Sequence, residues 1–316
     1  MKKRGIIKVA TLGFQQLAHP VKHGAEAVEA MKKHLEFQLS FVLPQRPDLI
    51  LFPEACDRYS SHTMPERRSY YAERGEKIRD FLAGVARDNN CYIGYSAARD
   101  RDGGGFFNST ELIGRDGSTA AEYHKNNCVV TEISNGGIHP GDAPVTVDTE
   151  FGRIGFAICF DLNFNEFRQQ YRVLRPDLML FSSMYHGGVV QNFWAYDLNC
   201  FLVSAVVGQQ SGVLDPVGER IASSTNYSPY AAAKINLDFE AVHLDFNWDK
   251  LQAARVKYGE KISIVDRGNT GVVILYSNTG EFSSSDICRE FEIELWRDYY
   301  RRSQAANEEC VSQARL

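Results

Sequence analysis

The sequence lacks the features of several large classes of protein. No apolar run is long enough to span a bilayer, and the first one, residues 6–14, ends at Gln15 and Gln16, too early for a signal peptide. The net charge of -5, with no basic run after residue 4, argues against a nucleic-acid surface. Seven cysteines without any Cys-x-x-Cys pair argue against a zinc site and for a reducing compartment. We therefore expect a cytoplasmic protein that contacts neither membrane nor nucleic acid and holds no metal.

What the chain does contain is a repeat. Residues 46–52, Arg-Pro-Asp-Leu-Ile-Leu-Phe, recur at residues 175–181 with a single change. A predicted helix precedes each copy, and a helix, a strand and a hairpin follow it. This order predicts a duplicated α/β half, and two such halves would pack two sheets face to face with helices outside. No linker separates the halves, so we expect one domain over residues 1–280 and a C-terminal helix and tail over residues 281–316.

Cys159 follows a short apolar strand predicted over residues 153–158. Asn163 and Glu166 have the spacing of a capping box, which predicts that a helix begins there. Backbone N–H groups and the helix dipole at such a turn favour a thiolate, so Cys159 is a candidate nucleophile. The alternative is a buried structural cysteine, which is common.

Two charged residues also follow predicted strands. Glu54 comes directly after the apolar run that ends at Pro53, where a carboxylate is costly unless it is solvated or working. Lys125 ends the second strand of a hairpin predicted about residues 116–117. Taken singly, these would be an exposed loop glutamate and a surface lysine. Together with a cysteine, they could serve as base and oxyanion partner.

The order of these pieces resembles the nitrilase superfamily of carbon–nitrogen hydrolases. The pieces are Pro-Glu-Ala at residues 53–55, His-Lys at residues 124–125 and Gly-Arg-Ile-Gly-x-x-Ile-Cys-x-Asp at residues 152–161. Pro-Gly at residues 140–141 and Asp-Pro-Val-Gly at residues 215–218 are also similar to family motifs. The resemblance extends from the first strand to about Tyr230.

This resemblance implies a four-layer α-β-β-α sandwich and a Glu–Lys–Cys triad. Cys159 would attack the carbonyl carbon, while Glu54 would take the thiol proton and later activate water. Lys125 and the backbone N–H of Phe160 would form the oxyanion hole. Glu132 is similar to a second family glutamate that positions the lysine and the substrate.

Other residues near these motifs have less certain roles. Tyr185 and His186 follow the second copy of the repeat and are expected to line the pocket. Cys56, Cys128 and His124 lie close to the candidate triad in sequence, but none has a strand-to-helix turn. A cysteine–histidine dyad would leave Glu54 and Lys125 unexplained, so packing roles are expected for these three.

The implied function is cofactor-free hydrolysis of a small linear amide or N-carbamoyl compound through a cysteine thioester, with release of ammonia. Nitrile hydrolysis, acyl transfer on the same triad, and a non-catalytic binding module remain alternatives. Leu162 and Asn163 supply no positive charge after the cysteine, which predicts that neutral amides are preferred over N-carbamoyl amino acids, and both over nitriles. Arg168, Arg172 or a distant loop could still provide such a charge.

The C-terminal segment predicts assembly. A helix is predicted over residues 287–302, with apolar residues four apart at Ile287, Phe291, Leu295 and Tyr299. Such a wide apolar face at a chain end could cover its own sheet or contact a second copy. We predict at least a homodimer, formed partly through this segment.

Overall fold

A computed structural model describes residues 5–18, 23–102 and 104–313 of the chain, which divides into two compact units. The larger unit is Lys8–Ile235. The smaller unit begins at Asn236 and includes the N-terminal residues up to Ile7. The boundary expected after residue 280 therefore lies at residue 236 instead, because the segment that follows builds a sheet and a core of its own.

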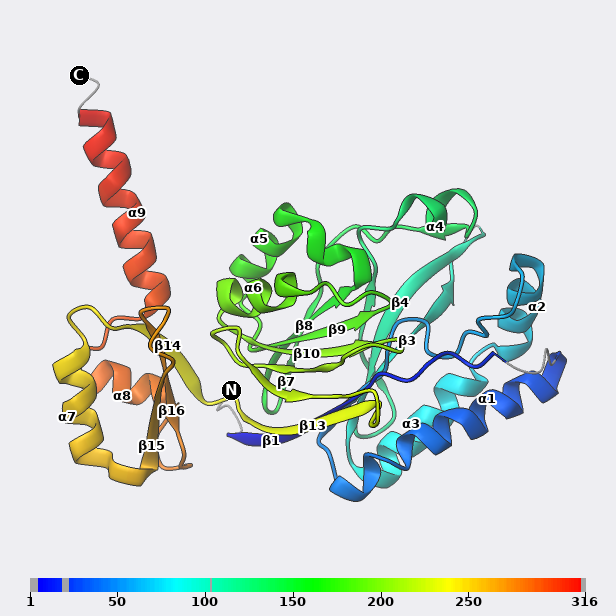
Figure 1. Cartoon of the computed structure of the whole chain (residues 1–316), viewed down its shortest axis with the longest axis horizontal. Coiled ribbons are helices and arrows are strands. Elements are labelled where there is room, and N and C mark those ends of the chain that lie inside the picture. The colour runs from blue at the N-terminus through cyan, green and yellow to red at the C-terminus, as the bar shows by residue number, and fades with distance from the viewer. Residues whose placement is uncertain (1–4, 19–22, 103, 314–316) are drawn as a thin grey trace. The chain divides into compact units, whose positions relative to one another are not determined.

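Two β-sheets form the centre of the larger unit (Figure 1). The first sheet has the order β13 (Tyr230–Asn236), β1 (Ile6–Leu12), β2 (Leu49–Leu51), β3 (Tyr92–Asp100), β4 (Phe106–Ile113), β5 (Thr119–His124), with β6 (Ile138–His139) paired to β4. The second has the order β12 (Arg220–Ser223), β11 (Gly212–Leu214), β10 (Phe201–Val206), β9 (Leu178–Ser183), β8 (Gly152–Ile158), β7 (Thr146–Thr149). The sheets face each other: the Thr11 hydroxyl donates to the Ser204 carbonyl at 2.6 Å, and Ser182 donates to Phe52 at 2.8 Å.

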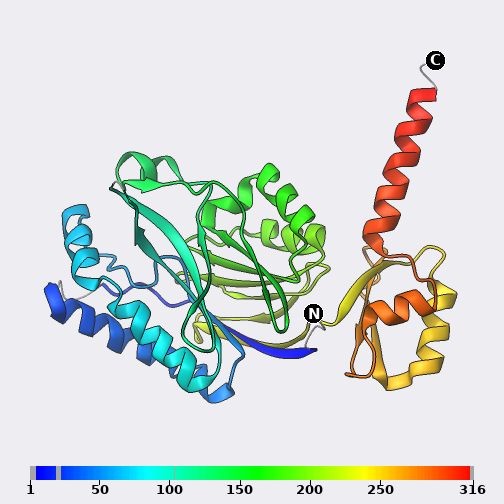
Figure 2. The ribbon, with the colours of Figure 1, turned by 180° about the vertical axis from the view of Figure 1, so that it is seen from behind.

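Helices cover the outer face of each sheet (Figure 1, Figure 2). The first sheet is covered by α1 (Gly24–Leu39) and α3 (Lys77–Asn89), with α2 (Met64–Arg74) beside α1. The second is covered by α5 (Asn165–Leu174) and α6 (Val189–Leu198). The sequence predicts a helix over residues 25–42 with apolar residues on one face, and this face is buried, with Met31 and Leu35 fully inaccessible. The predicted α-β-β-α sandwich is thus confirmed.

The two halves of the sandwich repeat each other in detail. Arg46 and Arg175, which open the repeated heptapeptides, both adopt the left-handed conformation with φ of 51° and 53°. Each ends a helical segment and precedes a proline, which excludes a further α-helical turn. Asn90 and Asn199 end the helix that precedes the next parallel strand of each half in the same way, with φ of 49° and 48°. Corresponding backbone caps at corresponding places support the interpretation of the repeat as a duplicated half.

Apolar residues at Ile78, Phe81, Leu82 and Val85 predict one helix over about residues 71–87, and the first part of this prediction is wrong. The chain forms α2 and α3 there, separated at Gly75, whose φ of 44° lies outside the helical region. Glycine adopts such a conformation without the steric cost that a side chain brings, so the helix ends at this point.

The smaller unit contains a three-stranded sheet that the sequence analysis did not predict. Its strands are β14 (Phe239–His243), β16 (Val272–Ser277) and β15 (Ile262–Asp266), all antiparallel. Helices α7 (Trp248–Tyr258) and α8 (Ser284–Glu290) pack against it, and Leu251, Ile262 and Val273 lie in the shared core. A capping box between Ser283 and Asp286 begins α8.

The single C-terminal helix predicted over residues 287–302 is also wrong. It is divided into α8 and α9 (Trp296–Gln313) because Glu292 turns left-handed, with φ of 53°, and Leu295 forms a β-bridge to Val242. Ile287 is buried in the core of the smaller unit, and Phe291 packs against that core. The predicted apolar stripe is therefore used inside this unit.

Helix α9 extends beyond the third sheet, and none of its residues is buried (Figure 1). Its first two turns are anchored: the His243 ring stacks on Tyr299 with centroids 4.0 Å apart, and Arg302 pairs with Glu294 at 2.9 Å. The homodimer stays a prediction, and light scattering at micromolar concentration will test it.

Three further findings on the described residues concern membrane spans, metal sites and disulfides. None of their helices is both long and apolar enough to cross a bilayer. They contain no group of three or more histidine, cysteine or acidic side chains arranged for a metal ion. All seven cysteines are free thiols.

Candidate active site

The candidate site lies where three strands of the sandwich end. Glu54 follows β2, Lys125 follows β5, and Cys159 follows β8. The Nζ atom of Lys125 lies 3.1 Å from Oε1 of Glu54, although the two residues are 71 positions apart in sequence. The Cys159 thiol interacts electrostatically with both. The three residues selected from the sequence thus come together because parallel strands of packed sheets end at one edge.

Lys125 is held between two carboxylates. Besides Glu54, its Nζ contacts both oxygens of Glu132 at 3.0 and 2.8 Å. The lysine side chain is 1% exposed and that of Glu54 is 3% exposed. Burial alone would lower the pKa of Lys125, but the charges of Glu54, Cys159 and Glu132 outweigh it and raise that pKa. Lys125 is therefore an ammonium that cannot serve as the base.

Asn108 on β4 connects the two carboxylates, and the sequence analysis missed it. Its side-chain Nδ2 donates to Oε1 of Glu54 at 2.7 Å and to Oε1 of Glu132 at 3.1 Å. Its Oδ1 is buried and has no hydrogen-bond partner among the described residues. The sequence could not identify Asn108 as a bridge between the two glutamates, because only the fold brings both of them to this strand.

The loop after β9 joins Glu54 to Cys159. The backbone N–H of Met184 donates to Oε2 of Glu54 at 2.8 Å. The same N–H and the Ser183 hydroxyl stabilise negative charge on the Cys159 sulfur. Both carboxylate oxygens of Glu54 thus accept hydrogen bonds, and these bonds fix the orientation of the carboxylate relative to the cysteine.

Cys159 occupies an unfavourable backbone conformation, with φ of 51°. A left-handed non-glycine residue costs about 1–3 kcal/mol and is typical of functional sites. Asp161 holds the turn in place by accepting hydrogen bonds from Ile158 N and Asn127 N, each at 2.8 Å, and from the Tyr123 hydroxyl at 2.7 Å. Its side chain was not among the predicted site residues, although it belongs to the motif.

The helix after Cys159 begins later than predicted. A 3₁₀ turn, η2 (Cys159–Asn163), comes first, and Phe164 is the N-cap of α5. Asn163 forms no capping box, because its side chain donates to the Tyr185 hydroxyl at 2.9 Å instead. The dipole of α5 therefore does not start at the cysteine.

The expectation that the turn favours a thiolate is accordingly wrong. Burial, and next the negative charge of Glu54, raise the pKa of the Cys159 thiol to about 12, and the opposing effect of Lys125 is smaller. The resting site holds a protonated thiol beside an ionised lysine. Attack by sulfur then requires a base, and Glu54 is the group in place to act as one.

This protonation state predicts a steep pH dependence of thiol reactivity. The rate of alkylation of Cys159 by a maleimide should rise about tenfold per pH unit between pH 7 and 10, because only the thiolate reacts. In Glu54→Gln the rise should be displaced to lower pH, since one cause of the raised pKa is removed. Peptide mass spectrometry after timed labelling measures this at the single residue. A plateau near neutral pH in the wild-type protein would show a preformed thiolate.

The other predicted site residues divide into two groups. Tyr185 lies beside the cluster of Glu54, Lys125 and Cys159. Burial raises the pKa of its hydroxyl, against the opposing effect of the hydrogen bond from Asn163. His186 has Arg220 as its charged neighbour, and its Nδ1 accepts from Gly188 N at 3.1 Å. Phe160 packs its ring edge-on against Phe164. His186 therefore belongs to the surrounding loop.

The three residues expected to have packing roles differ in their surroundings, and only Cys128 interacts electrostatically with Glu54, Lys125 and Glu132 among the described residues of this group. Cys56 is fully buried in the core. The Cys128 sulfur lies 3.8 Å from the Lys125 carbonyl, and burial raises its pKa to about 12. His124 stacks on Phe107 and shares a hydrogen bond with the Ser109 hydroxyl at 2.7 Å.

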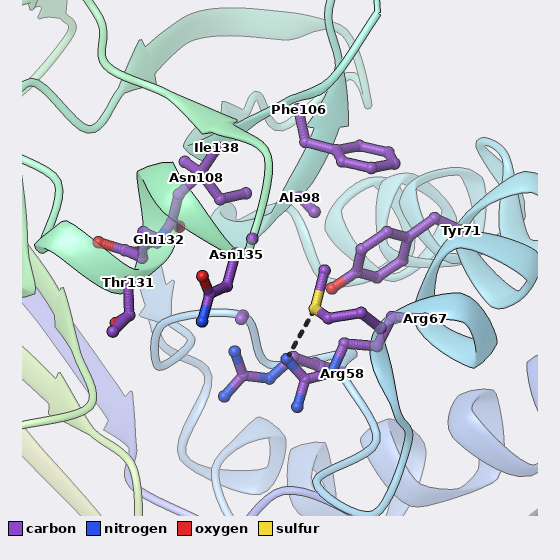
Figure 3. A pocket seen from close by; sticks show the side chains of 13 residues that line it. Arg58, Arg67, Tyr71, Ala98, Phe106, Asn108, Thr131, Glu132, Asn135 and Ile138 are labelled. Carbon is purple, nitrogen blue, oxygen red and sulfur yellow. Dashed lines mark hydrogen bonds between the residues drawn. The ribbon is translucent and has the colours of Figure 1, made fainter.

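A cavity of about 350 Å³ borders this cluster (Figure 3). Its polar wall includes Asn108, Glu132, Arg58 and Arg67. Apolar and small side chains complete it: Ala55, Met64, Tyr71, Ala98, Phe106, Ile138. A volume of this size suits a small organic molecule.

The positive charges that line the cavity come from the segment after β2 and from α2, far in sequence from Cys159. Arg168 pairs with Asp197 at 2.8 Å and Arg172 lies 3.6 Å from it, so both are neutralised there. Arg58 and Arg67 come from the segment after β2 and from α2. The cavity thus has positive charge from outside the segment after the cysteine, as the distant-loop alternative allows, and the preference for neutral amides stays a prediction.

The fold and this arrangement of strand-end residues define a member of the nitrilase superfamily. The carbon-nitrogen hydrolase family model matches residues 8–239, most of the chain, and the chain belongs to that family. The match ends close to the boundary between the two units.

Several known proteins are similar to this chain. Human omega-amidase NIT2 is 25% identical over 201 residues, covering 55% of this chain and 73% of the human protein. The chloroplastic omega-amidase of Arabidopsis thaliana is 23% identical over 249 residues, covering 69% and 65%.

Solved structures share the sandwich. Nit3 of Saccharomyces cerevisiae, a member of branch 10 of the nitrilase superfamily, superposes with a TM-score of 0.64 at 17% identity, covering 75% of this chain and 92% of that one. An amidase from Nesterenkonia sp. superposes at 0.63 with 18% identity, covering 73% and 90%. The NitFhit protein of C. elegans superposes at 0.64 with 20% identity, and the match spans 62% of its length.

Proposed function

We propose that this protein hydrolyses the carbon–nitrogen bond of a small linear amide through a thioester on Cys159, releasing ammonia. The observation that carries the proposal is the buried contact of Lys125 with Glu54 and Glu132, next to a cysteine in a strained turn. Burying a lysine ammonium against a glutamate is costly, and a purely structural core would gain from apolar residues instead. The amidases among its relatives support the same reaction class.

In the first half of the proposed reaction, the Cys159 sulfur bonds to the amide carbon. Glu54 takes the thiol proton, which the raised thiol pKa makes necessary. The carbonyl oxygen becomes an oxyanion, stabilised by the Lys125 ammonium and the Phe160 N–H. Glu54 then gives its proton to the departing nitrogen, the carbon–nitrogen bond breaks, and ammonia leaves a thioester behind.

In the second half, water cleaves the thioester. Glu54 takes a proton from the water as its oxygen bonds to the acyl carbon, and a second oxyanion forms at the same position. The carbon–sulfur bond then breaks, and the proton on Glu54 returns to the sulfur. Glu132 and Asn108 keep Lys125 and Glu54 oriented throughout, and the steps use only protein groups and one water.

The test is a screen of short amides, N-carbamoyl compounds and nitriles with ammonia detection, combined with intact-mass measurement of the protein during turnover. We expect ammonia release and a transient mass increase, equal to the acyl group, that maps to Cys159. Ammonia from nitriles alone would favour a nitrilase. Acyl transfer to an added amine in place of water would favour a transferase. If no class of compound in the screen yields either ammonia or a covalent adduct, the result would favour a binding module.

A further inference from the structure

Helix α9 lies outside the part of the chain that the family model matches, residues 8–239, so the family fold does not account for it. None of its residues is buried, and every residue from Tyr300 to Gln313 is exposed. The contacts that anchor it to the smaller unit come from its first two turns. A short helix without packing is only marginally stable in water, so the exposed turns call for a partner.

One side of α9 has the pattern of a helix-pairing surface. The large hydrophobic side chains exposed on this helix are those of Tyr300 and Val311. Gln304 and Asn307 lie between them, at intervals of four, three and four residues. This spacing places all four on one side of the helix, as along the line of contact between paired helices. We call these four exposed residues the seam.

The charges of α9 are divided along its axis. All its arginines lie in the first two turns, and from Ser303 to Gln313 the only charged residues are Glu308 and Glu309. Apart from Asp298, this order is the reverse of what the helix dipole favours, which is acids near the N-terminus and bases near the C-terminus. The division therefore does not serve the stability of a single α9. It gives the helix a positive half and a negative half.

Antiparallel pairing with an identical helix brings these opposite halves together. In the register that sets Tyr300 against the partner's Val311, the two amide residues of the seam also meet each other. Arg301 and Glu308 lie along one edge of the seam, so each Arg301 then lies beside the partner's Glu308. A parallel pair would instead place the arginine-rich halves side by side and the acidic halves side by side, where like charges repel.

The two edge residues have donors and acceptors left for such contacts. Arg301 pairs with Asp298 within α9 at 3.3 Å, yet its side chain is 67% exposed. Glu308 accepts a hydrogen bond from Gln304 at 3.1 Å and forms no ion pair with any residue that the structure describes. A guanidinium carries several N–H groups and a carboxylate several lone pairs, so each can hold a second partner.

We propose that the smaller unit binds a second copy of this chain through antiparallel pairing of the two α9 helices along the seam. An identical chain fits because α9 is complementary to itself when reversed: the tyrosine of each copy covers the valine of the other, and arginines face glutamates. The candidate active site takes no part in this contact, so the inference is independent of the proposed function.

Sedimentation equilibrium of the full chain measures the pairing. Arg301→Glu and Glu308→Arg should each weaken self-association about tenfold or more, because each sets like charges side by side. The double variant exchanges the two charges and should regain the wild-type Kd. Added salt should weaken the wild-type pair, since it screens exposed charges. The matched control is Arg255→Glu, the same charge change at an exposed position of α7, which should leave the Kd unchanged.

Disulfide trapping tests the direction of the helices. In a Cys310→Ser background, mild oxidation of Tyr300→Cys mixed with Val311→Cys should link position 300 of one copy to position 311 of the other, as mapped by peptide mass spectrometry. Val311→Cys alone should not link to its own copy. In the antiparallel register the two positions lie about 16 Å apart along the helix axis, beyond the reach of a disulfide.

Three results would each overturn the proposal. The first is a wild-type chain that stays monomeric throughout the concentration series. The second is self-association that neither Arg301→Glu nor Glu308→Arg changes, which would place the contact on another surface. The third is a disulfide from Val311→Cys alone, which would show a parallel pair. Circular dichroism of each variant checks that the helices are retained.

Discussion

Replacing Cys159 with alanine is expected to abolish amide hydrolysis, by at least about 10⁴-fold in kcat, as for other nucleophiles of covalent catalysis. Its thiol, at the turn after β8, interacts electrostatically with both Glu54 and Lys125, the base and the cation of the proposed reaction. The side chain is partly exposed and small, so its loss removes little packing. Ammonia release measures the activity, and circular dichroism with thermal unfolding checks that the fold is retained.

Two further cysteines provide the controls. Cys128→Ala should keep substantial activity, because the proposed reaction gives this thiol no role and its sulfur lies 3.8 Å from the Lys125 carbonyl. Cys56→Ala should also stay active but unfold at a somewhat lower temperature, because the residue is fully buried in the core. An inactive Cys128→Ala together with an active Cys159→Ala would show that the nucleophile is assigned to the wrong residue.

Replacing Lys125 with methionine is expected to damage both activity and stability. The variant loses the positive charge proposed for the oxyanion hole, which should lower kcat by about 10²- to 10³-fold or more. It also leaves the buried Glu54 and the half-buried Glu132 without their cation, and breaking a buried ion pair from one side costs about 3–5 kcal/mol. Urea unfolding of the purified variant measures the second effect.

The matched control for Lys125 is Lys77→Met. Lys77 pairs with Glu73 on the surface, where water screens the pair, so its loss should change stability very little. If Lys125→Met proved as stable as the wild-type protein, the two glutamates would not both be ionised in the fold, and the assignment of Glu54 as a ready base would fail.

The sequence alone was sufficient for the fold and for the three central residues. The repeated heptapeptide identified a duplicated half, and the structure repeats its backbone caps at Arg46 and Arg175. Glu54 and Cys159 could be selected because each directly follows an apolar strand. These are local signals, since a strand, its end and a motif lie within a few consecutive residues.

Several boundaries could not be predicted, because they depend on contacts between distant segments. The helix predicted through Phe291 is interrupted where Leu295 bridges to Val242, more than 50 residues earlier in the chain. The strands of the third sheet contain no repeat and no recognisable motif. The boundary between the two units at Asn236 therefore became evident only from the residues that pack into one core.

The sequence by itself determined the family, the sandwich and which acid, lysine and cysteine meet at its edge. Only the tertiary structure decided how these groups are charged and what else faces them: the protonated state of Cys159, the bridging of two glutamates by Asn108, and the lining of the cavity by Arg58 and Arg67. The physical reason is that a strand end is encoded locally. Burial and electrostatic interaction are instead sums over neighbours that the fold gathers from the whole chain.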